Sequence, residues 1–125
     1  GDSATPKGIK ADGHLMINGG GNYVSARGIG AIGIESGYGT VIDGGVTYSF
    51  GTKMGILFGT TGAYVSGTVL AGGESNSDFN NAYTMNLSNV QAQTISKIMS
   101  EDGKQLLGSY RWPVAMPSAT LTFLK

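Results

Sequence analysis

The chain has 125 residues, enough for one domain with a modest core but not for two. Eight basic residues balance eight acidic ones, so the chain lacks the positive field of a nucleic-acid-binding protein. Without cysteine there are no disulfides or thiolate metal sites, and a single histidine excludes a multi-histidine site within one chain. We therefore expect no cofactor and no nucleic-acid partner.

The N-terminal stretch is polar, and we predict a flexible segment over residues 1–12. One β-rich domain is expected to account for the whole chain, 1–125. No stretch has the apolar centre of a targeting signal. Low charge with abundant glycine, serine, threonine and asparagine is typical of exported proteins, so we predict a periplasmic or extracellular location.

Glycine occupies 18 of the 61 positions from Gly13 to Gly73, between short runs of alternating apolar and polar residues. Such alternation predicts strands. Two of these strands, 46–50 and 54–58, flank residues 51–53, and we expect them to pair as a hairpin.

The spacing between successive glycines has no fixed period, which argues against collagen and against a regular solenoid. Glycines within strands mark bends and bulges, so their density predicts strongly curved sheets. We therefore predict a mostly β fold, a small single-domain antiparallel β-barrel or sandwich with glycine-rich curved strands.

The segment that begins at residue 88 allows two interpretations. Ser88-Asn89-Val90-Gln91 has the form of a capping box and favours one short helix near residues 88–101. Asp102-Gly103 is also typical of a hairpin turn, which would join strands at 95–100 and 105–110. The pattern favours the helix slightly, and both interpretations stay open.

Residues Gly28–Gly33 match the G-x-G-x-x-G pattern of dinucleotide-binding loops. That pattern needs a following helix to hold the pyrophosphate and an acidic residue about twenty positions on. Gly37 and Gly39 disfavour the helix, and residues 47–53 contain no acid. In so glycine-rich a chain the match is attributed to chance.

Acid–base chemistry has little support in the sequence. Glu35 and Asp43 flank a predicted turn that would bring two carboxylates together, as glycosidases require. Paired carboxylates are also common at the ends of surface strands, and His14 has no G-x-S-x-G nucleophile motif to serve. We predict that the protein is not an enzyme.

The stretch from residue 54 to residue 73 carries no charge. Half of its positions are not apolar, and β-branched and aromatic residues alternate with small ones, which favours strands over a membrane-spanning helix. A hairpin of this composition would present an apolar surface to lipid, so a membrane surface is one possible contact.

A polar loop is predicted over residues 74–86, and oxygen-bearing side chains occur at every second position of its first half. Alternate residues of a curled loop can converge on a hard cation, although the EF-hand pattern is not met. The candidate ligands of a weak calcium site are Glu74, Asn76, Asp78 and Asn80. A solvated turn is the simpler interpretation.

Tyrosine outnumbers phenylalanine by six to four, and tyrosine suits half-wet surfaces. Such residues can stack on sugars or line the mouth of an apolar site. The candidate ligand-binding residues are Tyr48, Tyr64 and Phe58. The simpler interpretation places them at the rim of an ordinary β core.

Two functional hypotheses follow from these patterns. The first is a non-enzymatic extracytoplasmic β-domain that acts by self-assembly or by binding a surface or partner, as a homo-oligomer or with another protein. The alternative is a small β-barrel that binds a lipid or another apolar ligand.

Overall fold

The computed structural model describes residues 6–59 and 62–125, and within them the protein consists of strands and irregular segments without a helix. The mostly β prediction is therefore confirmed at the level of fold class. Nine strands precede residue 74: β1 (Lys7–Ala11), β2 (Leu15–Asn18), β3 (Gly21–Ala26), β4 (Ile32–Ser36), β5 (Gly39–Asp43), β6 (Val46–Gly51), β7 (Met54–Leu57), β8 (Gly62–Val65) and β9 (Thr68–Gly73). Four follow it: β10 (Tyr83–Val90), β11 (Ile95–Met99), β12 (Leu106–Arg111) and β13 (Met116–Leu124).

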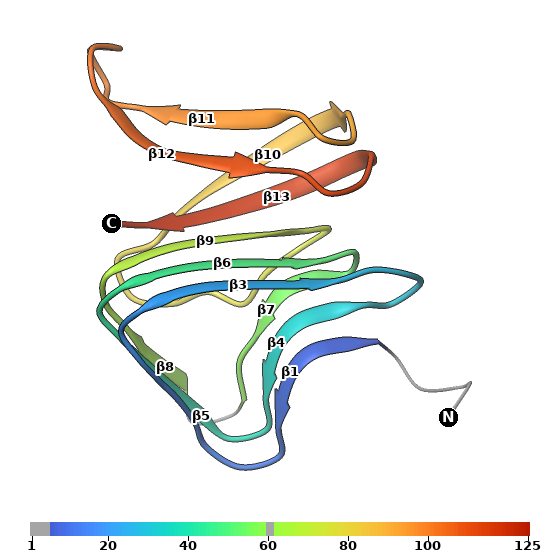
Figure 1. Ribbon diagram of the computed structural model, residues 1–125, viewed down its shortest axis with the longest axis vertical. Coiled ribbons are helices and arrows are strands. Elements are labelled where there is room, and N and C mark those ends of the chain that lie inside the picture. Colours follow the sequence, from blue (N-terminus) through green and yellow to red (C-terminus); the bar gives the residue numbers. More distant parts are fainter. Residues whose placement is uncertain (1–5, 60–61) are drawn as a thin grey trace.

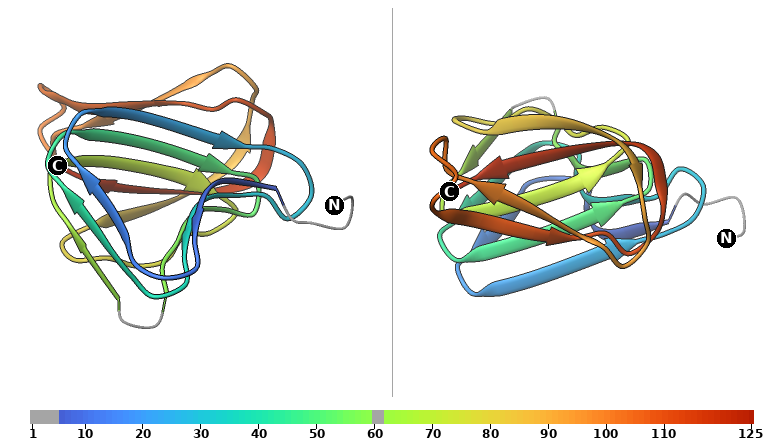
Figure 2. Two further views of the ribbon diagram at one scale, coloured as in Figure 1. Left: turned by 60° about the horizontal axis from the view of Figure 1, so that its bottom comes forward. Right: turned by 90° about the horizontal axis from the view of Figure 1, so that it is seen from above.

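The first nine strands wind through three coils of a parallel β-solenoid (Figure 1). Each coil contributes one strand to each of three sheets, in the orders β1-β4-β7, β2-β5-β8 and β3-β6-β9, and every pairing in these sheets is parallel. The three sheets surround a common interior (Figure 2). No closed barrel is found among the described residues.

Three sequence-based expectations were therefore wrong for this half of the chain. The strands pair in parallel rather than antiparallel, and a solenoid is present. Strands β6 and β7 belong to different sheets, so residues 51–53 turn a corner of the coil instead of closing a hairpin. Because parallel strands pair only after a whole coil, their pairing leaves no local turn signal.

The repeat is visible once complete coils are compared. Lys7 pairs with Ile32, and Ile32 pairs with Met54, so the coils are offset by 25 and then 22 residues. Each of these residues begins an x-Gly-Ile triplet. The spacing between successive glycines does not show this repeat. The corner at 27–31 is longer than its counterpart at 52–53, so the two coils differ in length.

Glycine is required where coils stack closely at a corner. Gly45 has a φ of 71°, and a Cβ atom at this position would overlap the carbonyl oxygen of Gly20 in the coil below. Gly67 occupies the equivalent corner of the third coil with a φ of 84°. Only a residue without a side chain satisfies both the backbone conformation and the close approach.

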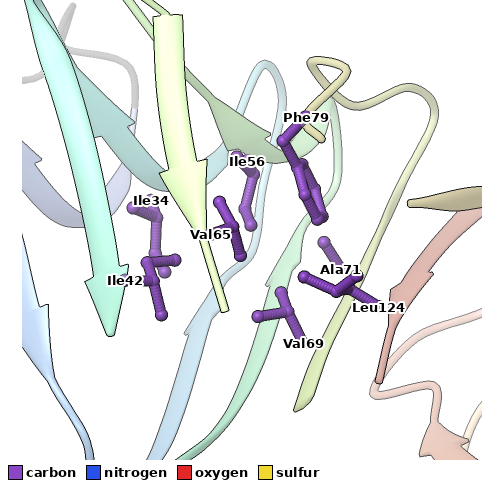
Figure 3. Close-up of a cluster of buried hydrophobic side chains, with 8 residues drawn as sticks. All are labelled: Ile34, Ile42, Ile56, Val65, Val69, Ala71, Phe79 and Leu124. Atoms are coloured by element: carbon purple, nitrogen blue, oxygen red, sulfur yellow. The ribbon is translucent and has the colours of Figure 1, made fainter. Parts of the chain in front are cut away.

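The solenoid interior forms the first of two apolar cores (Figure 3). Ile9, Ile34 and Ile56 occupy equivalent positions of successive coils, so identical side chains stack along the axis. The buried members of this core are Ile34, Ile42, Ile56, Val65, Val69, Ala71, Phe79 and Leu124. Burial of these stacked aliphatic groups is the main favourable contribution to the free energy of folding here.

The last four strands extend and cover one face of the solenoid. Strand β13 pairs antiparallel with β9, and β10 pairs with β13, giving a five-stranded sheet in the order β10-β13-β9-β6-β3. The β11–β12 hairpin lies over the outer face of that sheet (Figure 2). Between them is the second core: Phe50, Leu70, Tyr110, Trp112, Met116, Ala119, Leu121 and Phe123.

The expectation of a helix near residues 88–101 was wrong, and the hairpin alternative is confirmed. Ser88 belongs to β10, and Ile95–Met99 pairs antiparallel with Leu106–Arg111. The Asp102 carboxylate accepts hydrogen bonds from the Ser100 hydroxyl at 2.6 Å and the Lys104 N–H at 3.0 Å, which holds the turn. Pairing and burial of apolar strand residues outweigh a local capping signal.

The two segments predicted to be irregular are partly strand. Within residues 1–12, β1 occupies Lys7–Ala11, and the first five residues of that segment lie outside the described residues. The predicted loop 74–86 is irregular up to residue 82 and then enters β10. No helix in the described chain is long and apolar enough to cross a membrane.

Candidate functional site

Asn76 acts as a cap for the last coil. Its Oδ1 atom accepts the backbone N–H groups of Gly55 at 2.9 Å and Ile56 at 3.1 Å, on the outer edge of β7. Its Nδ2 atom donates to the Ala71 carbonyl at 3.0 Å and to Thr122 Oγ1 at 3.1 Å. One side-chain amide thus satisfies groups from three strands that would otherwise lack partners.

Asn80 and Ser77 continue this cap. The Asn80 amide accepts the N–H of Val65 and donates to its carbonyl, both at 3.1 Å, as a neighbouring strand would. The Ser77 hydroxyl accepts the N–H of Phe58 at 3.1 Å, and its own N–H donates to the Ile56 carbonyl at 2.9 Å. Residues 74–82 therefore close the open edges of β7 and β8.

Two of the four candidate calcium ligands are already engaged by the backbone. The Asn76 and Asn80 amide oxygens bind the backbone, whereas the Glu74 and Asp78 side chains are exposed. Among the described residues there is no group of three His, Cys, Asp or Glu side chains that could hold a metal ion. Within this alternating polar pattern, Asn76 and Asn80 therefore have a capping role, and the calcium site stays a prediction.

At the opposite end of the solenoid, residues 6–59 and 62–125 provide no comparable cap. Strands β1, β2 and β3 are each outermost in their sheets, and no other strand of the described chain pairs with their outer edges. The interior side chains at this end are only partly buried: Ile9, Leu15, Ile17 and Val24. We call the surface made by β1, β2 and β3 the open end.

Charge is distributed unevenly over the open end. Strand β1 carries two lysines, of which Lys7 binds Glu35 at 2.9 Å and Lys10 approaches Asp12 at 3.3 Å. Strands β2 and β3 carry no charged residue. Charged side chains on an edge strand discourage pairing with another strand, so β2 and β3 are the accessible part of this edge.

The three candidate ligand-binding residues lie on different parts of the molecule. Phe58 packs edge-on against Phe79, with ring centroids 5.7 Å apart, beside the solenoid core. Tyr64 lies on β8 and is 59% exposed. Tyr48 lies on the outer face of β6, half-buried beside the hairpin.

Tyr48 has a neighbour that the sequence interpretation missed. Tyr23 occupies the register-equivalent position on β3, and the two rings lie 6.4 Å apart at an angle of 41°. Their separation of 25 residues equals the first coil offset, which is the signal that would have found the pair. With Ile95, Ser109 and Arg111 of the hairpin they line a groove of about 220 Å³. We call it the tyrosine groove.

Glu35 and Asp43, the two carboxylates considered for acid–base chemistry, contact different partners. Strands β4 and β5 belong to different sheets, and Glu35 binds Lys7 while Asp43 accepts a long contact from the Ser66 hydroxyl at 3.4 Å. His14 lies against the Tyr38 ring, with centroids 5.2 Å apart.

The G-x-G-x-x-G match forms the corner between β3 and β4 and enters β4. A strand rather than a helix therefore follows it, so no helix N-terminus is present there to receive a pyrophosphate.

The chain was compared with protein families, with curated proteins and with solved structures. No protein-family model, curated protein or solved structure matches this chain.

Proposed function

We propose that this protein is a non-enzymatic assembly domain that self-associates through its open end. The observation that carries this proposal is the difference between the two ends of the solenoid. Residues 74–82 and β13 satisfy the backbone groups of the last coil, whereas the outer edges of the first coil have no partner within the described residues. An unpaired strand edge over an apolar interior is a template for another strand.

A second copy of the same end is the occupant that fits. Open ends meeting head to head around a two-fold axis bury Ile9, Leu15, Ile17 and Val24 against their counterparts. The two-fold axis makes the new strand pairs antiparallel, a pairing that needs no connecting segment. Because the outer end of each partner carries the Asn76 cap, growth stops at a dimer.

An exported location, periplasmic or extracellular, is part of this proposal and agrees with the low charge of the chain. The alternative of an apolar ligand inside a barrel has less support. The two apolar cores are filled by side chains of the protein itself, and the strands of the described chain do not close into a barrel.

The proposal is tested by measuring mass in solution for a variant at the open end and for a matched control. Met16 and Tyr64 face the outside of the same sheet in one register row, 65% and 59% exposed, at the open and the capped end respectively. Met16→Lys places like charges next to each other across a two-fold edge, which disfavours the dimer. Tyr64→Lys adds the same charge away from it.

We expect light scattering to give twice 12.8 kDa for the natural protein and for Tyr64→Lys, and 12.8 kDa for Met16→Lys. A natural protein that stays at 12.8 kDa up to about 1 mM, where even a weak contact of about 4 kcal/mol is half formed, overturns the proposal. Circular dichroism of each variant verifies that a change in mass does not reflect unfolding.

A further inference from the structure

The tyrosine groove joins an aromatic surface to a polar rim. Tyr23 is 62% exposed, and Tyr48 is half-buried beside it. The hairpin contributes Ser109, which carries a hydroxyl, and Arg111, which carries a guanidinium, to the lining of the same groove. Aromatic rings and side chains that can donate hydrogen bonds thus line one groove, the combination typical of a small-ligand site.

The charge beside the groove is positive and unbalanced. Lys97 lies directly opposite Ser109 in the hairpin, and Ile95 lies opposite Arg111, so both cations belong to neighbouring positions of β11 and β12. The two ion pairs found within the described residues involve Lys7 and Lys10, not Lys97 or Arg111. None of the five described residues that line the groove is acidic.

Gln93 fixes the position of the Arg111 guanidinium. The Arg111 Nε–H donates to Gln93 Oε1 at 3.0 Å, and the Gln93 Nε2 group donates to the Pro113 carbonyl at 3.2 Å. Gln93 has a φ of 64°, a conformation that residues other than glycine and asparagine rarely adopt. Its N–H donates to the Trp112 carbonyl at 2.7 Å, which holds that conformation. The terminal nitrogens of Arg111 make no hydrogen bond with any described residue and are free to bind an anion.

These features define the class of ligand. Enclosed apolar pockets bury most of a ligand's surface, but this groove is open to solvent, so its occupant keeps one side in water. A pyranose ring has an apolar face that packs on tyrosine and hydroxyl groups that remain hydrated. A carboxylate on that ring pairs with a guanidinium in two parallel hydrogen bonds. We propose that the tyrosine groove binds an acidic sugar, with Tyr23 and Tyr48 under the ring and Arg111 on its carboxylate.

The test uses four acidic monosaccharides as methyl glycosides: glucuronic, galacturonic, mannuronic and N-acetylneuraminic acid. Each is titrated into the ¹⁵N-labelled protein to about 50 mM, because one sugar ring contributes few contacts and a Kd near 10 mM is expected. Amide signals of residues 22–24, 47–49 and 109–111 should shift with at least one acid. The methyl ester of the same sugar keeps its shape without its charge and should bind at least fivefold more weakly.

Tyr23→Ala and Tyr64→Ala form a matched pair, since both remove an exposed tyrosine from the outside of the solenoid. We expect Tyr23→Ala and Arg111→Gln to weaken acid binding at least fivefold, and Tyr64→Ala to leave it unchanged. If no acid shifts the groove signals, or if Tyr23→Ala binds as well as Tyr64→Ala, the proposal is overturned. Equal binding of acid and ester overturns the role of Arg111. The oligomeric state is measured separately, so this proposal stands or falls apart from self-association.

Discussion

The hydroxyl of Tyr110 donates a hydrogen bond of 2.7 Å to the backbone carbonyl of Ser49, and both residues are buried. This contact joins the β11–β12 hairpin to β6, the middle strand of the solenoid sheet that it covers. Tyr110 also packs edge-on against Trp112, with ring centroids 4.8 Å apart. The hairpin is therefore anchored to β6 through a buried hydrogen bond within the second core.

Replacing Tyr110 by phenylalanine keeps the ring and removes this contact. The Ser49 carbonyl then loses one buried hydrogen bond, so we expect a loss of about 0.5–1.5 kcal/mol in the free energy of unfolding. Urea denaturation measures the loss. Tyr83→Phe, which removes a hydroxyl from a 71% exposed ring, is the control and should cost almost nothing. Equal stability of the two variants would show that the anchoring contact contributes little.

Tyr110 also makes the free energy of unfolding depend on pH in the alkaline range. Burial raises the pKa of Tyr110 well above its ordinary value of 10.0. Above pH 10 the unfolded chain loses this proton while the folded protein retains it, so the free energy of unfolding falls as pH rises. We expect Tyr110→Phe to have a flatter stability profile above pH 10 than the natural protein. Parallel profiles of the two proteins would contradict this assignment.

Asn76 is expected to matter more for stability than its neighbours in the loop. Asn76→Ala leaves the N–H groups of Gly55 and Ile56 without their acceptor, at a cost of about 1–3 kcal/mol for a buried group. Asp78→Ala changes an exposed side chain of the same loop and should stay within about 0.5 kcal/mol. Thermal unfolding compares the two, and a similar Tm for both would contradict the capping role.

Calcium gives a separate test of this loop. Because the amide oxygens of Asn76 and Asn80 are bound to backbone groups, millimolar calcium should leave the Tm unchanged. A calcium-dependent rise in Tm that disappears in Asp78→Ala would instead restore the metal-site interpretation. Magnesium at the same concentration controls for ionic strength.

Substitutions at Gly44 and Gly45 distinguish the energetic cost of a left-handed backbone from the cost of close packing between coils. Both have positive φ, 75° and 71°, but a Cβ atom meets open space at Gly44 and the Gly20 carbonyl at Gly45. Gly44→Ala should cost about 1–2 kcal/mol, the penalty for the left-handed conformation alone. Gly45→Ala must also push two coils apart and should cost clearly more in urea denaturation. Equal costs would show that the corner adapts without strain.

Local sequence patterns predict structure correctly where residues close in sequence also pair with one another. The hairpin alternative is one example: the structure has a turn at Asp102-Gly103 between strands close to the expected ranges 95–100 and 105–110. The preference for a helix failed because Ser88 and Gln91 match a capping box locally, while β10 pairs with β13, about thirty residues away. A capping signal cannot report such distant partners.

The candidate sites show the same division. The sequence pattern predicts a binding role for Tyr48, but its partner Tyr23 and the Arg111–Gln93 pair depend on coil stacking and on the docked hairpin. The polar alternation from Glu74 to Asn80 was recognised, but its role follows from the strand edges it meets.

By itself, the sequence determined that this protein is built of short, glycine-rich β-strands with little charge, because alternation and glycine density act locally. The x-Gly-Ile triplets at Gly8, Gly33 and Gly55 also carry the solenoid repeat, which emerges when whole coils are aligned. Only the tertiary structure decided which strands pair, which end is capped and which residues share the tyrosine groove. Those relations join residues a full coil or more apart, and the hydrogen bonds and buried surface that select them exist only after the chain has folded.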